Sequence, residues 1–430
     1  MIRHYLHICL AGLLLFALGS CRGSNMDDSG TMPWDKDLDD KPEAPRSEAV
    51  VGEPLPAWEE GYLDIHAVNT GRGECTFFIM PDGTTLVVDA GEIASKSSDY
   101  DWVAQRPDAD TRAYVTYARY MSHFLPEVAG GKLDYFLVTH FHIDHFGTRS
   151  DKFETVNGYH VTGMMGLYSL LRFNKLIDRA WPDYSDEALK TSDFSTSIID
   201  YRTFVDYNKT RGLTVEKFDL GSKSQIAMVH KPGDYDFEIS NVAANGLVWN
   251  GSEGVDAFGT ANHSENGSSC SIYLRYGDFD YLTCGDGGQN GRIENPLAQQ
   301  INHRLEAMKA HHHMSVNTMT NTSMAIFKPM VVVTQSFYVR PEDQPNASVF
   351  GNLLSTTSFV GEKNFYFTNI DPSVQASKAT LYSNPSVKST GGHVVIRVAP
   401  GGGSFYVYVL DDTDTKYTVK QIDGPFICIH

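Results

Sequence analysis

Three histidines and an aspartate stand within six residues, directly behind an apolar stretch typical of a β-strand. The stretch spans residues 133–138, and His140, His142, Asp144 and His145 follow it. Because side chains of an extended segment alternate between two faces, His140 and His142 point the same way. The turn that follows can direct Asp144 and His145 toward a second point nearby. Imidazole nitrogen and carboxylate oxygen together suit zinc-like ions, so the spacing predicts a binuclear metal site behind a strand rather than a His-rich surface loop.

The N-terminus has the pattern of a secretory signal. A positive residue, Arg3, precedes the apolar run 8–18, and Leu18-Gly19-Ser20-Cys21 forms a small-residue cleavage site. The site resembles a bacterial lipobox, which implies that residues 1–20 are removed and that Cys21 carries a lipid anchor. We therefore expect a lipid-anchored protein of the bacterial cell envelope, periplasmic or surface-exposed. A plain secretory signal with an incidental cysteine is the alternative. The apolar run is short for a helix that spans a membrane.

The rest of the chain divides into a tether and a folded part. Residues 21–56 are acidic, contain prolines and lack apolar periodicity, which is typical of a solvated tether. The hydrophobic content of 41% is ordinary for a protein with a core, so we expect one domain over residues 57–430. Residues from about 180 to 235 show no clean strand alternation and predict an insertion. Two apolar runs on either side of three glycines predict a C-terminal β segment over about 385–430.

Charge and cysteine content narrow the classes of partner. The formal net charge of −18 repels a phosphate backbone, which disfavours extended nucleic acid and favours a small-molecule or surface-polymer substrate. Beyond the signal, Cys75, Cys270, Cys284 and Cys428 lack any Cys-x-x-Cys spacing. Neither a cysteine zinc site nor a disulfide framework is readable from them, and the sequence indicates no oligomeric state.

Short apolar runs, turns and one helical pattern predict a layered α/β domain. A tight turn at Pro81-Asp82-Gly83 predicts a hairpin, and spacing of three to four residues from Ala113 to Phe124 predicts a helix that stops before Gly130-Gly131. Strands are predicted at residues 63–68, 76–80, 85–89, 133–138, 271–276, 279–284 and 330–334, and a hairpin at 393–398 and 405–410.

Several motifs together resemble the metallo-β-lactamase-fold hydrolases. Residues 140–145 have the family's H-x-H-x-D-H form, and Asp89-Ala90-Gly91 resembles its first motif. The likeness is closer to the hydrolase domain of the ComEC type and to phosphorylcholine esterases, where a Gly-x-Gly-acid hairpin comes first, here Gly71-Arg72-Gly73-Glu74. The resemblance covers residues from about 62 to 334. It implies a four-layer αββα sandwich, here with an insertion and a C-terminal β extension.

Two later motifs complete the resemblance. Asp286 ends a predicted hairpin and takes the place of the family's aspartate that bridges two metals. The segment 308–315 resembles the family's K-V-x-H-H-G-S, which implies that His313 ligates the second metal and His312 reaches a substrate oxyanion. Met314 stands where the family usually has glycine, so the local backbone is expected to differ.

The third histidine of the first metal stays open. His263 fits the place of the broad superfamily's histidine before the bridging aspartate. The ComEC-like branch often has a polar segment there instead, which residues 265–269, Glu-Asn-Gly-Ser-Ser, resemble. His160 is a competing candidate, and a site without a third histidine is the remaining alternative.

The resemblance implies a hydrolase with two zinc-like ions bridged by Asp286. A water held between the ions would have its pKa lowered toward neutrality, and the metals would polarise the scissile oxygen. Asp89, Asp144 and His312 are the expected catalytic residues, with Asp89 orienting a metal-bound histidine. A phosphodiester is the favoured substrate. The alternatives are an amide or ester hydrolase, including lactam or thioester opening, and a non-catalytic surface binding protein with a degenerate metal site.

Overall fold

Two large mixed sheets form the centre of the molecule in a computed structural model. The structure describes residues 47–94, 102–186, 189, 195–261, 263–339, 344–355 and 361–429. The expected signal at 1–20, Cys21 and the tether as far as residue 46 lie outside these residues. Among the described residues, no helix combines the length and hydrophobicity that crossing a bilayer requires.

The first sheet has nine strands in the order β20-β19-β18-β1-β2-β3-β4-β7-β8. It is antiparallel from β20 to β3 and parallel from β3 to β8. The hairpin expected at residues 393–410 joins this sheet beside β1, so the C-terminal strands extend it. Its strands are β1 (Leu63–Ala67), β2 (Thr76–Ile79), β3 (Thr85–Val88), β4 (Leu133–Val138), β7 (Phe173–Asp178), β8 (Thr214–Lys217), β18 (His393–Val398), β19 (Ser404–Leu410) and β20 (Val419–Ile427).

The second sheet repeats this plan with the order β11-β10-β9-β12-β13-β14-β15-β16-β17. It is antiparallel from β11 to β13 and parallel from β13 to β17. Its strands are β9 (Phe237–Ala244), β10 (Leu247–Trp249), β11 (Gly254–Asp256), β12 (Ser271–Tyr276), β13 (Phe279–Thr283), β14 (Ala307–Lys309), β15 (Val331–Thr334), β16 (Asn364–Phe367) and β17 (Val387–Ser389). A separate small hairpin pairs β5 (Thr155–Val156) with β6 (Tyr159–His160).

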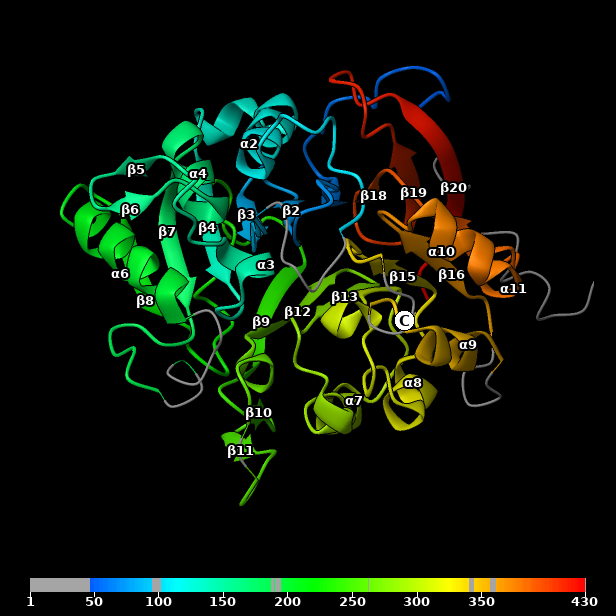
Figure 1. Cartoon of the computed structure of the whole chain (residues 1–430). Helices are drawn as coiled ribbons and strands as arrows, with labels where there is room; N and C mark the ends of the chain where they lie inside the picture. Colours follow the sequence, from blue (N-terminus) through cyan, green and yellow to red (C-terminus); the bar gives the residue numbers. More distant parts are fainter. Residues whose placement is uncertain are drawn as a thin grey trace, which may run out of the picture. The chain divides into compact units, whose positions relative to one another are not determined.

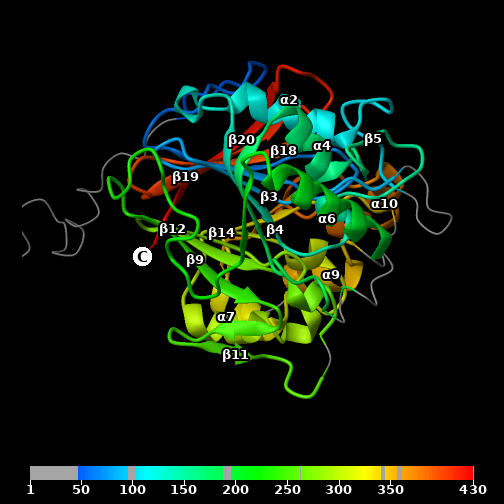
Figure 2. The same ribbon diagram turned by 90° about the vertical axis from the view of Figure 1, so that its left-hand side faces the viewer.

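Three hydrophobic cores give the order of the layers. Strand side chains alternate, so Phe78 of β2 joins a core shared by both sheets, while Phe77 joins a core between the first sheet and its helices. The third core lies between the second sheet and its own helices. Helices lie on opposite sides of the strands in both views (Figure 1, Figure 2). The fold is therefore the four-layer αββα sandwich of the metallo-β-lactamase fold, as expected.

The helices of the two outer layers differ in length. On the first sheet the longest is α6, which belongs to the expected insertion and places Tyr201 and Phe204 in the core. The helices are α2 (Ala113–Phe124), α3 (Ile143–Phe146), α4 (Gly163–Leu170), α6 (Ser195–Lys209), α7 (Glu294–Ile301), α8 (Asn321–Phe327), α9 (Ala347–Ser355), α10 (Pro372–Ser377) and α11 (Ala379–Tyr382). Single 3-10 turns span Glu127–Ala129, Asn266–Ser268, Gln289–Gly291 and His311–Met314.

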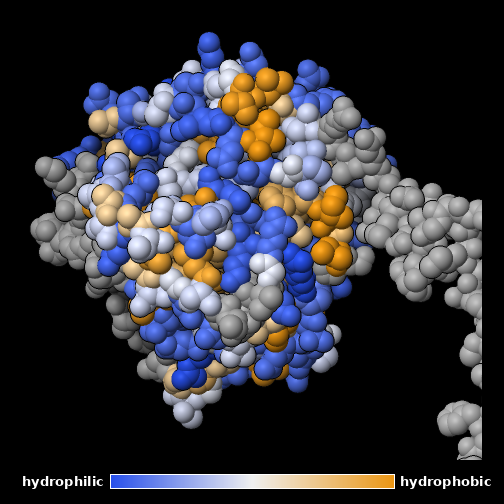
Figure 3. All heavy atoms as spheres, turned by 90° about the vertical axis from the view of Figure 1, so that its right-hand side faces the viewer, coloured by the Kyte–Doolittle hydropathy of each residue, from blue (hydrophilic) through white to orange (hydrophobic). Residues whose placement is uncertain are grey.

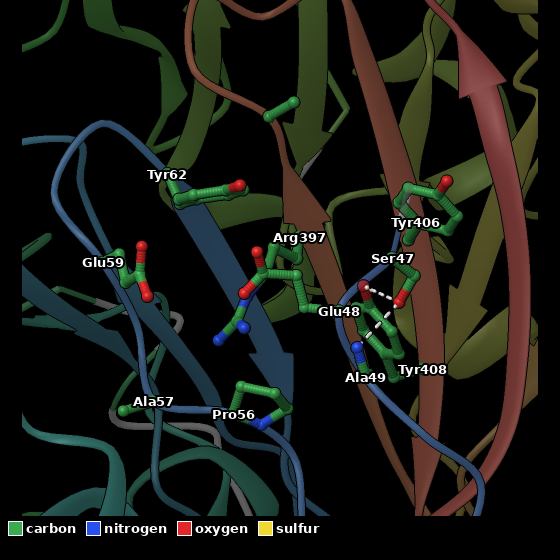
Figure 4. A pocket seen from close by; sticks show the side chains of 11 residues that line it. Ser47, Glu48, Ala49, Pro56, Ala57, Glu59, Tyr62, Arg397, Tyr406 and Tyr408 are labelled. Carbon is green, nitrogen blue, oxygen red and sulfur yellow. Dashed lines mark hydrogen bonds between the residues drawn. The ribbon is translucent and has the colours of Figure 1, made fainter. Parts of the chain in front are cut away.

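The first described residues pack across β1, β18 and β19. There Ser47 and Tyr408 share a 3.0 Å hydrogen bond between hydroxyl groups, at one side of a small pocket that Tyr62, Arg397 and Tyr406 also line (Figure 4). On the face shown in Figure 3, the coloured residues are mostly hydrophilic and the hydrophobic ones form separate groups.

Candidate metal centre

The candidate residues lie in loops that follow the C-terminal ends of strands in both sheets. Asp89 follows β3, residues 140–145 follow β4, Asp286 follows β13 and residues 311–313 follow β14. Ligand sites of α/β sheets gather at this end of the strands. Hydrogen bonds join the loops of the two sheets: the Cys270 amide donates to the Thr139 carbonyl at 2.9 Å. The site is thus assembled from both halves of the sandwich.

One group of ligand atoms has the spacing of a tetrahedral site. A zinc ion with bonds of about 2.0–2.2 Å holds its ligand atoms about 3.3–3.6 Å apart. His145 Nε2 lies 3.2 Å from Asp286 Oδ2, 3.3 Å from His313 Nε2 and 3.7 Å from Asp144 Oδ2. His313 Nε2 lies 3.4 Å from Asp144 Oδ2 and 3.5 Å from Asp286 Oδ1. His145, Asp286 and His313 therefore have ligand atoms close enough together to hold one ion, and the carboxylates of Glu74 and Asp144 lie beside them.

A second group adjoins the first and shares Asp286 with it. His140, His142 and Asp286 can present ligand atoms that all lie within 4.8 Å of one another. His140 Nε2 and His312 Nε2 each lie 3.7 Å from Asp286 Oδ2. Asp286 therefore stands between two clusters of imidazoles, in the position of a bridging ligand.

Buried polar atoms without hydrogen-bond partners fit a role as metal ligands. Among the described residues, His140 Nε2 and Asp286 Oδ1 are buried and have no hydrogen-bond partner. Leaving a buried polar atom unsatisfied costs about 1–3 kcal/mol. Nitrogen and carboxylate donors are the set that zinc-like ions accept, so the residues present fit a pair of divalent ions.

The charges in the cluster lead to the same conclusion. Burial alone would lower the pKa of His145, but Asp286, Asp144 and Asp89 outweigh burial and raise it well above its ordinary value. Burial is likewise outweighed at His313, mainly by Asp286, which raises its pKa to about 9. The buried carboxylates thus favour positive charge at both imidazoles. Divalent ions would supply that positive charge instead.

Asp89 makes the contact of an orienting carboxylate. Its Oδ2 lies 2.8 Å from His145 Nδ1 and accepts a 2.7 Å hydrogen bond from the Thr139 hydroxyl. Its Oδ1 accepts from the Thr139 amide at 2.8 Å. A carboxylate at Nδ1 fixes the ring so that Nε2 faces the cluster. Gly91 lets the loops meet here, because a Cβ atom at this position would lie 1.7 Å from the Asp144 carbonyl oxygen.

Two buried charges beside the cluster were not assigned a role from the sequence. Glu74 and Lys309 form an ion pair at 2.8 Å between Oε2 and Nζ, and both side chains are almost completely buried. Lys309 Nζ also donates to the Gly285 carbonyl at 2.8 Å, and Glu74 Oε2 lies 3.4 Å from His313 Nδ1. Both residues stand in motifs noted above, the Gly-x-Gly-acid hairpin and the Lys before the His pair. Their places in these motifs were the sequence signal that could have identified them.

The structure does not bring His263 or His160 into the cluster. His263 Nδ1 is 2.8 Å from the Ser268 hydroxyl, and its ring packs against Phe258. His160 Nδ1 is 2.8 Å from Asp200, in the layer that contains α6. The polar segment around Asn266 lies closer, because Asn266 Nδ2 is 3.3 Å from His312 Nε2. Of the three alternatives, the described geometry agrees with a second group, His140, His142 and Asp286, that has no third histidine from the preceding hairpin.

The backbone around the His pair departs from an ordinary helix. His312, His313 and Met314 have φ values of 47°, 51° and 62°, in the left-handed region that favours glycine. Glycine at the position of Met314 would adopt this conformation without strain. Met314 instead fills the interior with a fully buried side chain.

Comparisons with known proteins show only distant likenesses. No family model and no curated protein matches the sequence. Among solved structures, a mutant of the β-hydroxylase CmlA is 12% identical with a TM-score of 0.37, over 80% of this chain and 55% of that one. Unliganded yeast PDE1 is 12% identical with a TM-score of 0.35, over 78% and 99%. The short form of human tRNase Z is 10% identical with a TM-score of 0.29, over 76% and 92%.

The chain spans about half the length of the two CmlA structures, from Streptomyces venezuelae in one case. The chain itself has a metallo-β-lactamase fold with candidate metal-binding residues at the place where its two sheets meet.

Proposed function

We propose that the protein is a metal-dependent hydrolase that cleaves a small phosphodiester. The observation that carries the proposal is the pair of ligand groups that share Asp286. Two divalent ions held by these groups would supply an activated water and Lewis-acid stabilisation of the displacement at phosphorus. The ions would be zinc or another divalent metal that accepts nitrogen and oxygen ligands.

The chain's own residues have separate tasks in this scheme. Asp144, His145, Asp286 and His313 would hold one ion, and His140, His142 and Asp286 the other. Asp89 keeps His145 Nε2 directed at the cluster. His312 has 23% of its side chain exposed, whereas His140 and His313 are fully buried. It is therefore placed to donate a hydrogen bond to an anionic oxygen of the substrate.

The net charge of −18 supports a small diester over an extended nucleic acid. An amide or ester hydrolase on the same site is the alternative enzymatic function. A surface binding protein with a degenerate metal site is the alternative outside catalysis.

Metal analysis combined with a diesterase assay tests the proposal. We expect about two divalent ions per chain and hydrolysis of bis-p-nitrophenyl phosphate. Asp286→Asn should abolish turnover and lower the metal content. His263→Gln is the matched control, because this histidine lies outside the cluster, and it should keep both. Turnover of only lactams or thioesters would favour the alternative enzyme, and a protein that binds no metal would refute both enzymatic functions.

We further propose that the protein is displayed on a bacterial membrane through a lipid on Cys21. The lipobox-like sequence supports this location. Membrane fractionation of Cys21→Ser against wild type, in a bacterial host that processes lipoproteins, tests it: the variant should leave the membrane fraction. An unchanged distribution would refute the anchor.

A further inference from the structure

A small aromatic and apolar cluster lies beside the metal centre, separate from the three main cores. We call it the aromatic wall. Its buried members are Ile93, Val103 and Phe337, and its partly buried members are Trp102, Ile143, Tyr338 and Val339.

The wall contacts the metal-binding loops directly. The Phe337 ring packs edge-on against the candidate ligand His313, with 4.8 Å between ring centroids. Ile143 stands between His142 and Asp144 in the metal-binding motif itself. The wall is therefore continuous with the centre where the reaction would occur.

Backbone pairing holds the rings of the wall in place. The Val103 amide donates to the Phe337 carbonyl at 3.0 Å, and Trp102 pairs with Tyr338 in an antiparallel bridge. The Tyr338 ring lies 4.9 Å from both the Phe337 and the Trp102 rings, centroid to centroid. A series of rings thus extends from a ligand imidazole outward to Trp102.

The side chains of the wall differ in exposure, and only the partly exposed ones can contact a ligand. Phe337 and Val103 are 1% exposed and act as core. Trp102, Tyr338 and Ile143 remain only partly buried although they are large and apolar. Apolar and aromatic surface beside a few convergent polar groups is the usual lining of a small-molecule site.

From this arrangement we infer that the wall binds a planar ring on the substrate and so determines specificity. The inference rests on the proposed function and adds the substrate class: a small organic phosphodiester in which the group beside the phosphorus carries an aromatic ring. Stacked or edge-on ring contacts favour such a group over an alkyl group by about three- to tenfold each. The substrate is a small ester and not an extended nucleic acid, because the net charge of −18 repels a phosphate backbone.

Two substrates with one leaving group test the inference. p-Nitrophenyl phenyl phosphate and p-nitrophenyl methyl phosphate both release p-nitrophenolate, so they differ only in the second ester group. We expect wild type to prefer the phenyl ester in kcat/KM. Trp102→Ala and Tyr338→Ala should each reduce that preference about three- to tenfold through KM, with little change in kcat for the methyl ester. Tyr338→Phe should retain it.

Tyr406→Ala is the control, because Tyr406 is a partly buried tyrosine that lines the pocket of Figure 4 instead of the wall. It should leave the preference unchanged. Calorimetric binding of phenylphosphonate and methylphosphonate to the metal-loaded protein gives a readout without turnover. The phenyl compound should bind more tightly to wild type, and the alanine variants should lose the difference.

The two hypotheses fail in different ways. If neither ester is hydrolysed but phenylphosphonate is still preferred through Trp102 and Tyr338, the diesterase proposal is wrong and the wall stands. If wild type shows no preference in either experiment, or both alanine variants keep it, the wall has no part in specificity.

Discussion

Glu294 and His311 share a 2.8 Å hydrogen bond between Oε1 and Nδ1, and both side chains are fully buried. Glu294 also accepts hydrogen bonds from the backbone amides of Met319 and Thr320, at 2.7 Å and 3.0 Å. One carboxylate therefore fixes both ends of the loop that contains His312 and His313. Neither residue was singled out as functional from the sequence.

Glu294→Gln should weaken metal binding. The amide cannot replace the charge that holds His311, so the loop with the left-handed residues should lose its fixed conformation. Loss of a residue that supports metal ligands costs about 10- to 100-fold in affinity. Competition with a chelator measures this, and urea unfolding of the metal-free protein reports stability separately. A variant that loses stability but keeps its metal affinity would make the contact structural only.

Asp89→Asn should have a similar effect through His145. An amide has one accepting oxygen and cannot accept from the Thr139 amide, the Thr139 hydroxyl and the imidazole together. His145 therefore loses its fixed orientation, and metal affinity should fall about 10- to 100-fold. Asp134→Asn is a matched control. Its carboxylate accepts from the amide and hydroxyl of Thr85 in the same way, away from the cluster. Equal loss of metal in both variants would contradict a specific role for Asp89.

Arg179 and Glu265 should matter for stability as well as for the site. Arg179 Nε donates to Glu265 Oε1 at 2.8 Å, and the same oxygen accepts from the Phe141 amide, between the two histidines of the second group. Arg179→Met leaves the buried Glu265 carboxylate without its cation and should cost about 3–5 kcal/mol of unfolding free energy. The double variant with Glu265→Gln should recover part of it. Urea unfolding measures both, and an additive loss would show that the two residues are not coupled.

Asp64 should contribute a pH-dependent part of the stability. Burial alone would raise its pKa, but Arg397 and His66 lower it to about 2. Arg397 binds it through Nε at 2.8 Å and Nη2 at 2.6 Å. A carboxylate with a depressed pKa stabilises the fold above its unfolded value near 4, and this stabilisation is lost as the pH falls toward 2. The contribution at neutral pH is about 2.5 kcal/mol.

Asp64→Asn should remove this part of the acid sensitivity. Unfolding of wild type and variant in urea between pH 2 and pH 7, with chelator present, measures the difference. Stability curves that run parallel through pH 2–4 would contradict the assignment.

The sequence predicted best those helices and strands whose pattern lies within a single segment of the chain. The bounds of β4, β12 and α2 agree with the expected ones, because an apolar run or a helical period needs no distant partner to be recognised. The tight turn between β2 and β3 is present, with the Gly83 amide donating to the Met80 carbonyl.

The features that were not predicted depend on contacts between residues far apart in the sequence. Glu74 and Lys309 are far apart in the sequence, and only the folded sheets bring them together. His263 has the residue type and place of a ligand, but Ser268 and Phe258 hold its ring elsewhere. Spacing along the chain cannot reveal such competition between partners.

Asp286 comes from the second sheet, whereas His140, His142, Asp144 and His145 come from the first. Ions held by this set would bind the halves of the sandwich to each other, so metal affinity contributes to cohesion as well as to chemistry. Neither half alone contains a complete centre. A chelator should therefore act as a mild denaturant of this protein, with its effect strongest at the junction of the two sheets.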